Sequence, residues 1–77
     1  MNKQRRKAID AVREKLEELL EELEAIKDEE QEAFDNLPES LQDSERGQAM
    51  EEAVENLEYS IDYIEEITEQ FLPSAME

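Results

Sequence analysis

The side chains that could do chemistry in this chain are almost all carboxylates. There are 24 Asp and Glu residues, and the sequence contains no His and no Cys. A di-metal centre of the helical-bundle type uses Glu-x-x-His pairs, so its nitrogen ligands are missing here. A calcium-binding loop needs a central Gly, and residues 28–39 contain none. We therefore expect no metal site and no cofactor, and only weak, diffuse attraction of cations.

The serines are poor candidates for nucleophiles. A serine hydroxyl attacks a substrate when a neighbouring base takes its proton, and His is the most common base. The chain offers no evident base for any of its serines, which are Ser40, Ser44, Ser60 and Ser74. Without Cys there is also no thiolate and no disulfide. The sequence therefore predicts a protein that is not an enzyme.

The net charge of −16 is distributed unevenly. Residues 1–15 carry six basic and two acidic side chains, whereas residues 16–77 carry only Lys27 and Arg46 against 22 acids. Nucleic acid and anionic membranes are poor partners for such a surface, so direct nucleic-acid binding is not expected. No apolar run approaches the roughly 20 residues of a membrane span, and none has the pattern of a signal peptide. We expect a cytoplasmic protein.

The apolar residues predict two long helices that position these charges. In the first half they recur in alternating steps of three and four residues, at Ile9, Val12, Leu16, Leu19, Leu23 and Ile26. In the second half they recur in the same way, at Met50, Val54, Leu57, Ile61, Ile64, Thr68 and Phe71. Pro38 and Pro73 are expected to end the two helices, and Ser44 to cap the second. The predicted elements are a helix over 3–35, a connection over 36–43 that could include a short helical turn begun by Ser40, and a helix over 44–72.

These elements predict an all-α fold, a two-helix antiparallel hairpin that forms one domain over residues 1–77. Folding at about residue 40 pairs positions whose numbers sum to about 80, and sets Ala33 against Gly47. The apolar stripes are wider than one facing helix can cover, because Leu20, Phe34, Ala53 and Ile67 flank them. We therefore expect two copies to dimerise into a four-helix bundle. A helical groove on another protein is the alternative partner.

Two sets of charges could control how the helices align. Glu30 falls in the apolar stripe opposite Met50, where Arg46 could reach it and where a charge could specify register. The basic segment Lys3–Lys7 opposes the helix dipole at its own end. In an antiparallel pair it would lie beside Glu65, Glu66 and Glu69, where charge pairing would favour alignment. A small nucleic-acid patch at this basic end is the functional alternative.

One surface is a candidate for binding a partner. Tyr59 and Tyr63 stand one helical turn apart and off the apolar stripe, and tyrosine is favoured at interfaces because it joins apolar area to a polar tip. Acidic residues surround them on the predicted outer face of the second helix: Glu51, Glu55, Glu58 and Asp62. This face could bind a protein through its aromatic rings, or a basic cleft through its carboxylates.

The connection carries a resemblance. The run Phe34 to Gly47, FDNLPESLQDSERG, is similar to small acidic helical-hairpin proteins of Gram-positive bacteria and their phages, a group without an assigned activity. The likeness covers about a fifth of the chain, and the flanking helices are generic coiled-coil sequence. It implies a phage or prophage accessory protein, and it supplies no functional residues.

Three functions follow from these features. The first is a non-enzymatic protein-interaction module, a homodimeric helical bundle that holds a host or phage protein. The second is an acidic mimic of nucleic acid that inhibits a DNA- or RNA-binding enzyme by occupying its basic cleft. The third is RNA binding through the basic end of such a bundle.

Overall fold

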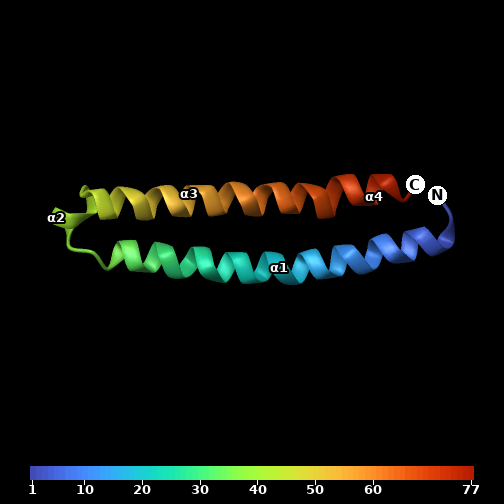
Figure 1. Cartoon of the computed structure of the whole chain (residues 1–77), viewed down its shortest axis with the longest axis horizontal. Helices are drawn as coiled ribbons and strands as arrows, with labels where there is room; N and C mark the ends of the chain where they lie inside the picture. Colours follow the sequence, from blue (N-terminus) through green and yellow to red (C-terminus); the bar gives the residue numbers. More distant parts are fainter.

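The computed structural model describes residues 1–77, and every regular element in it is helical. Figure 1 shows two long helices side by side and antiparallel, joined by a short one, with both termini at the same end. In chain order the elements are α1 (Lys3–Asp35), α2 (Glu39–Gln42), α3 (Glu45–Glu66), the π-helical turn η1 (Ile67–Phe71) and α4 (Leu72–Ala75). The molecule is a rod of 58 × 16 × 13 Å. The predicted all-α class is confirmed.

Side chains cap the starts of both long helices. The Asn2 side chain accepts a hydrogen bond of 2.8 Å from the N–H of Arg5, at the start of α1. The Ser44 hydroxyl oxygen accepts one of 3.2 Å from the N–H of Gly47, at the start of α3. Each cap satisfies a backbone donor that has no partner within the helix. None of the helices has an apolar stretch of the length needed to cross a bilayer.

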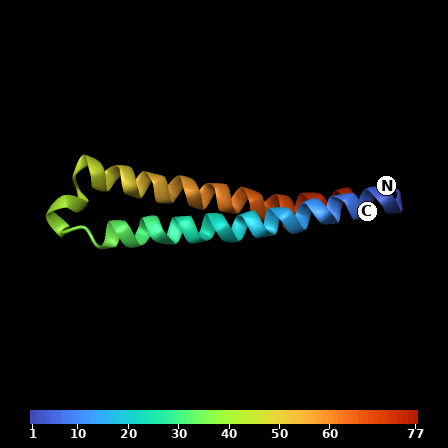
Figure 2. The same cartoon turned by 60° about the horizontal axis from the view of Figure 1, so that its bottom comes forward.

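The connection is more ordered than a loop. After Pro38 the chain forms the single turn α2, which begins at Glu39, one residue before the predicted Ser40. The Gln42 side chain donates a hydrogen bond of 3.2 Å to the carbonyl oxygen of Leu37. The Ser44 hydroxyl donates to the carbonyl oxygen of Leu41. These bonds hold α2 across the end of the α1–α3 pair, which Figure 2 shows as the closed end of the rod.

The prediction that Ala33 packs against Gly47 is wrong. Ala33 is exposed, and Gly47 is buried beneath α2 instead of α1. A methyl group built on Gly47 would lie 2.8 Å from the carbonyl oxygen of Leu41 and closer still to that of Gln42. The absence of a side chain at position 47 therefore lets α3 start directly against the backbone of α2.

The face of α1 that packs on α3 differs from the predicted one. Apart from Glu24, the half-buried residues of α1 follow steps of four and three: Ile9, Arg13, Leu16, Leu20, Leu23, Lys27, Glu30 and Phe34. Val12, Leu19 and Ile26 were expected in the same stripe, but they remain 49%, 52% and 50% exposed. The stripe is wide enough for either set to face α3, and long aliphatic stems let Arg13 and Lys27 join the contact while their charges stay near water.

Pro73 does not end the second helix. The helix continues to Ala75, because a π-helical turn at Ile67–Phe71 precedes the proline and changes the hydrogen bonding there. The N–H of Leu72 donates to Ile67, five residues back, instead of to Thr68. Pro73 has no N–H to offer. The carbonyl of Thr68 therefore loses both of its possible helical donors, and Arg13 replaces them with a hydrogen bond of 2.9 Å from Nε.

The π-turn also rotates the end of the helix. A π-turn adds about one residue to a helical turn, so every residue after it is displaced around the axis. Phe71 was expected in the stripe that faces α1, and it is 55% exposed. Leu72 and Met76 are half-buried in its place. The inward face of the helix therefore passes from Ile61 and Thr68 to Leu72.

Arg13→Leu should lower the free energy of unfolding by about 1–3 kcal/mol, the cost of leaving a buried carbonyl unpaired. Thr68 is only 2% exposed, so water has little access to replace the lost donor. In Pro73→Ala a backbone N–H returns near this carbonyl, and the same Arg13 substitution should then cost less. Urea unfolding of the four variants of this double-mutant cycle measures the difference. Fully additive effects would show that the Arg13 side chain does not serve the carbonyl.

Candidate interaction surfaces

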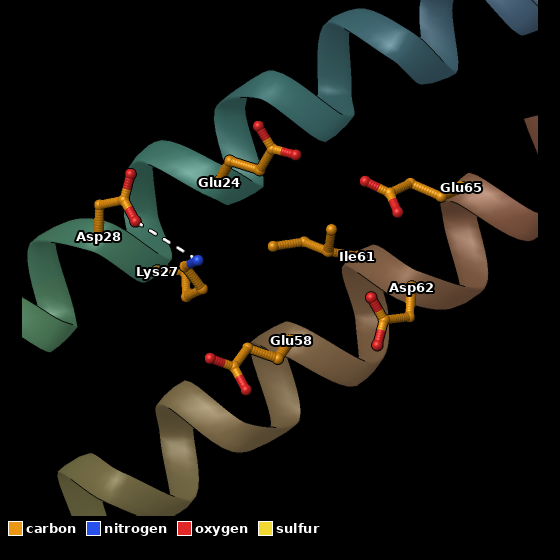
Figure 3. A pocket seen from close by; sticks show the side chains of 7 residues that line it. All are labelled: Glu24, Lys27, Asp28, Glu58, Ile61, Asp62 and Glu65. Atoms are coloured by element: carbon orange, nitrogen blue, oxygen red, sulfur yellow. Dashed lines mark ion pairs between the residues drawn. The ribbon is translucent and has the colours of Figure 1, made fainter.

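A groove between α1 and α3 gathers carboxylates from both helices. Figure 3 shows its lining residues, which are Glu24, Lys27, Asp28, Glu58, Ile61, Asp62 and Glu65. Lys27 is the one cation among them, and its Nζ lies 3.5 Å from Asp28 Oδ1. Five carboxylates against one ammonium give the groove a negative potential, which attracts cations and basic surfaces. No three carboxylates of the molecule stand close enough together to share a metal ion.

A second groove continues the same side of the rod toward the closed end. Its lining residues are Gln31, Phe34, Glu51, Val54, Glu55 and Glu58. Glu58 belongs to both grooves, so the two hollows lie on one face of the α1–α3 pair. We call this side, marked by Glu24, Glu51, Glu58, Asp62 and Glu65, the acidic face.

The opposite side of the pair is apolar. On α1, Glu24 follows the half-buried Leu23 by one residue and so turns about 100° toward the acidic face, whereas Ile26 follows it by three and turns about 60° the other way. On α3, Asp62 follows the buried Ile61 by one residue and Ser60 precedes it by one, so they turn in opposite directions. The side away from the grooves, which we call the apolar face, carries Val12, Leu19, Ile26 and Ala33 from α1, Ala53 and Ser60 from α3, and Ile67 from η1.

The apolar face has no cover within the chain. Val54 and Ile61 are the only buried apolar side chains, so the contact of α1 with α3 makes a very small core. The accessible surface is 5923 Å², whereas a compact monomer of 9.0 kDa exposes about 4,900 Å². The excess of about 1,000 Å² is comparable with the roughly 800 Å² that each partner contributes to a stable interface.

The two tyrosines lie on the exposed surface of α3, Tyr59 53% and Tyr63 65% exposed. The Tyr59 hydroxyl donates a hydrogen bond of 3.1 Å to Glu55 Oε1. This bond raises the pKa of Tyr59 above its ordinary value of 10.0, and the negative charge of Glu55 acts in the same direction. The bond also fixes the ring beside Glu55, one helical turn away. An aromatic ring and a carboxylate are thus presented together.

In the Tyr63→Phe variant, where Tyr59 is the only tyrosine, ultraviolet titration should give a pKa above 10.0. Adding Glu55→Gln removes the charge and should lower that pKa, whereas Glu52→Gln, elsewhere on α3, should not. Because the fold favours the neutral phenol, the stability contributed by this bond is present below the unfolded pKa and is lost as pH rises through the folded one. An unchanged pKa in the Glu55 variant would mean that the bond does not persist in solution.

The acids predicted around the tyrosines lie closer to α1 than expected. Glu51, Glu55, Glu58 and Asp62 are all exposed, and each of them lines one of the two grooves. They were placed on the outer face of α3, away from α1. The structure puts them on the acidic face, with Tyr59 at its border through Glu55. Sequence spacing identified these residues but missed Glu24 and Asp28, which come from the other helix.

Glu30 and Arg46 do not meet as an ion pair. Glu30 is half-buried on the side of α1 that packs on α3, and Arg46 is exposed in the first turn of α3. The ion pairs in the molecule are Arg13 with Asp10, at 3.3 Å, and Lys27 with Asp28, at 3.5 Å. The next residue, Gly47, packs against the backbone of α2. A role for Glu30 in specifying register therefore has no cationic partner within the chain.

The basic N-terminal end is unpaired as well. The predicted charge pairing between Lys3–Lys7 and the acids Glu65, Glu66 and Glu69 is absent, because neither of the two ion pairs includes these residues. Arg13 is the one basic residue of this end that reaches across, and it contacts the backbone of η1. The other cations of the N-terminal end are available to groups outside the chain.

Comparison of the chain with models of protein families, with curated proteins and with solved structures found no match. The class of the protein therefore follows from its own geometry, as an all-α rod with one acidic and one apolar face.

Proposed function

We propose that the protein is a non-enzymatic protein-interaction module, a helical hairpin that completes its core by pairing with a second copy in a homodimeric four-helix bundle. The observation that carries the proposal is the apolar face, where Val12, Leu19 and Ile26 stand about half exposed in a row. Burying the exposed half of each large side chain in a partner gains roughly 0.8–1.5 kcal/mol, about half of the value for a fully exposed side chain. The single chain has only two buried apolar residues, so this gain is large compared with the core of the monomer.

Sedimentation equilibrium over a micromolar concentration series tests this proposal directly. The expected result is a species with twice the 9.0 kDa mass of the chain. Thermal unfolding should shift to higher temperature as concentration rises, because association stabilises the folded state by mass action. A helical monomer with a concentration-independent melting temperature would overturn the bundle.

The surface offered to another protein is then the side of the bundle that bears Tyr59 and Tyr63. Their exposure and the fixed position of the Tyr59 ring support this assignment, because interface energy concentrates in a few aromatic anchors. The resemblance of the connection to phage-associated proteins supports a role as a phage or prophage accessory protein that binds a host or phage protein in the cytoplasm. The double variant Tyr59→Ala with Tyr63→Ala should then weaken binding of that protein more than neutralising the nearby acids.

The second candidate function is inhibition of a DNA- or RNA-binding enzyme by an acidic mimic of nucleic acid. The observation that favours it is the acidic face, where carboxylates of α1 and α3 gather around a single lysine. An enzyme held by this face should be released from the immobilised protein by duplex DNA and by moderate salt. The variant with Glu51→Gln, Glu55→Gln, Glu58→Gln and Asp62→Asn should not retain it. Binding that neither salt nor DNA disrupts would instead support the tyrosine surface.

A further inference from the structure

We propose that the second copy lies on the apolar face in the opposite direction. The basic end that carries both termini, which we call the open end, then lies beside the acidic closed end of the partner, which carries α2. This inference rests on the proposed homodimer and specifies how its copies are arranged. The dimer has a two-fold axis that crosses the rod near its middle, at the level of Leu19 and Ser60.

The spacing of the apolar face fits such an axis. Val12, Leu19 and Ile26 are evenly spaced by seven residues, so a half-turn about Leu19 exchanges Val12 of one copy with Ile26 of the other. On the neighbouring helix the same operation about Ser60 exchanges Ala53 with Ile67, a small residue with a large one. The surface is therefore self-complementary when reversed, as an isologous interface requires.

Leu19 and Ser60, the residues about which these half-turns are centred, stand at nearly the same level of the rod. The hydrogen bond between Arg13 and Thr68 fixes the alignment of α1 with the second helix, and it joins positions whose numbers sum to 81. Position 19 therefore faces about position 62, which is about 3 Å along the helix from Ser60 at 1.5 Å per residue. One axis can pass close to Leu19 and Ser60 together.

The charges of the two ends decide whether the second copy lies parallel to the first or reversed. The open end, residues 1–15 and 66–77, has six basic and five acidic side chains, a net charge of +1. The closed end, residues 28–53, has one basic and ten acidic side chains, a net charge of −9. A parallel dimer would set the two −9 ends against each other, within the range where repulsion is not screened at physiological salt. The reversed dimer separates them by much of the 58 Å rod.

The unpaired cations give the reversed dimer a further attraction. Lys3, Arg5, Arg6 and Lys7 form no ion pair within their own chain. In the reversed dimer they lie alongside the partner's segment 28–53, where ten acids are available. In the parallel dimer they would lie beside the partner's open end, where only five acids are available. The N-terminal segment, which opposes its own helix dipole, thus gains its partners only on association.

A distance measurement between spin labels tests the direction. The chain has no Cys, so Ser74→Cys in the full-length protein places a single label on α4, near the open end. It lies 14 residues from Ser60, so in the reversed dimer two labels should be about 40 Å apart along the rod. In the parallel dimer they should be within the width of a four-helix bundle, about 25 Å. Double electron–electron resonance distinguishes these distances.

A label at Glu21→Cys, exposed on α1 near the middle of the rod, is the matched control. It should report a short distance in either direction and so shows that a dimer is present. A short distance from both labels would overturn the reversed arrangement and leave the homodimer standing. A mass of one chain under the same conditions would overturn the homodimer and this inference together.

Discussion

Gly47→Ala should lower the free energy of unfolding by up to about 2 kcal/mol, although Ala is the better helix former by about 1 kcal/mol. The added methyl group would lie 2.8 Å from the Leu41 carbonyl oxygen, closer than a carbon and an oxygen can approach. The atoms that it meets belong to the backbone of α2, so no side chain can rotate to make room. Overpacking of this kind usually costs about 1–3 kcal/mol.

Urea unfolding at fixed protein concentration measures this effect, and Arg46→Ala is the matched control. Arg46 lies one residue before Gly47, is exposed and forms no ion pair, so its replacement should change stability by no more than about 0.5 kcal/mol. A stabilised Gly47→Ala variant would mean that α2 does not rest on α3 in solution.

Leu19→Gln should weaken self-association about 10- to 100-fold. Leu19 is 52% exposed in the single chain, in the middle of the apolar face, and a symmetric dimer buries it twice. Because each leucine is already about half buried, burying the rest gains roughly 0.8–1.5 kcal/mol each and about 1.5–3 kcal/mol for the two, and each 1.4 kcal/mol is a factor of ten in the dissociation constant. Gln is also a good helix former, so α1 itself should be little affected. Sedimentation equilibrium measures the change.

The neighbouring substitution Glu18→Gln is the control for Leu19, because Glu18 is exposed and lies outside the apolar face. It should leave the dissociation constant nearly unchanged. If Leu19→Gln associates as strongly as the unmodified chain, the interface lies elsewhere on the rod.

The all-α class and the start of each long helix could be read from sequence because local signals determine them. A regular apolar repeat separates helix from strand, and Ser44 is the type of residue that caps a helix. Pro38 lies between two helical segments because the residue before a proline resists the helical conformation. Such signals act over a few residues and do not depend on what the helices pack against.

The choice of the packed face could not be read in the same way. Leu16 and Leu23 belong to two overlapping apolar rows, one continued by Leu19 and the other by Leu20. Apolar pattern alone favoured the row with Leu19, because the row with Leu20 includes Arg13 and Lys27. The contact with the facing helix decides between them. Arg13 has a carbonyl to bind there, and that carbonyl is free because of the π-turn and because Pro73 has no N–H.

Only the part of the acidic face that α3 contributes was predicted from the sequence, for a similar reason. Spacing along one helix was enough to group Glu51, Glu55, Glu58 and Asp62. The contribution of Glu24 depends on how α1 is rotated about its own axis, and that rotation follows from the choice of packed face. Spacing along the second helix alone could not show that its acids border a groove shared with α1, so they were placed on an outer surface.

The shared position of the two termini has a practical consequence. Both chain ends lie at the open end of the rod, so a tag, a fluorophore or a fused domain attached to either of them stays clear of both long faces. The closed end then extends as much as 58 Å from the point of attachment. The chain could be inserted into a surface loop of a carrier protein through both ends. It would then form a rod that projects from the carrier, and both connections would lie at one place.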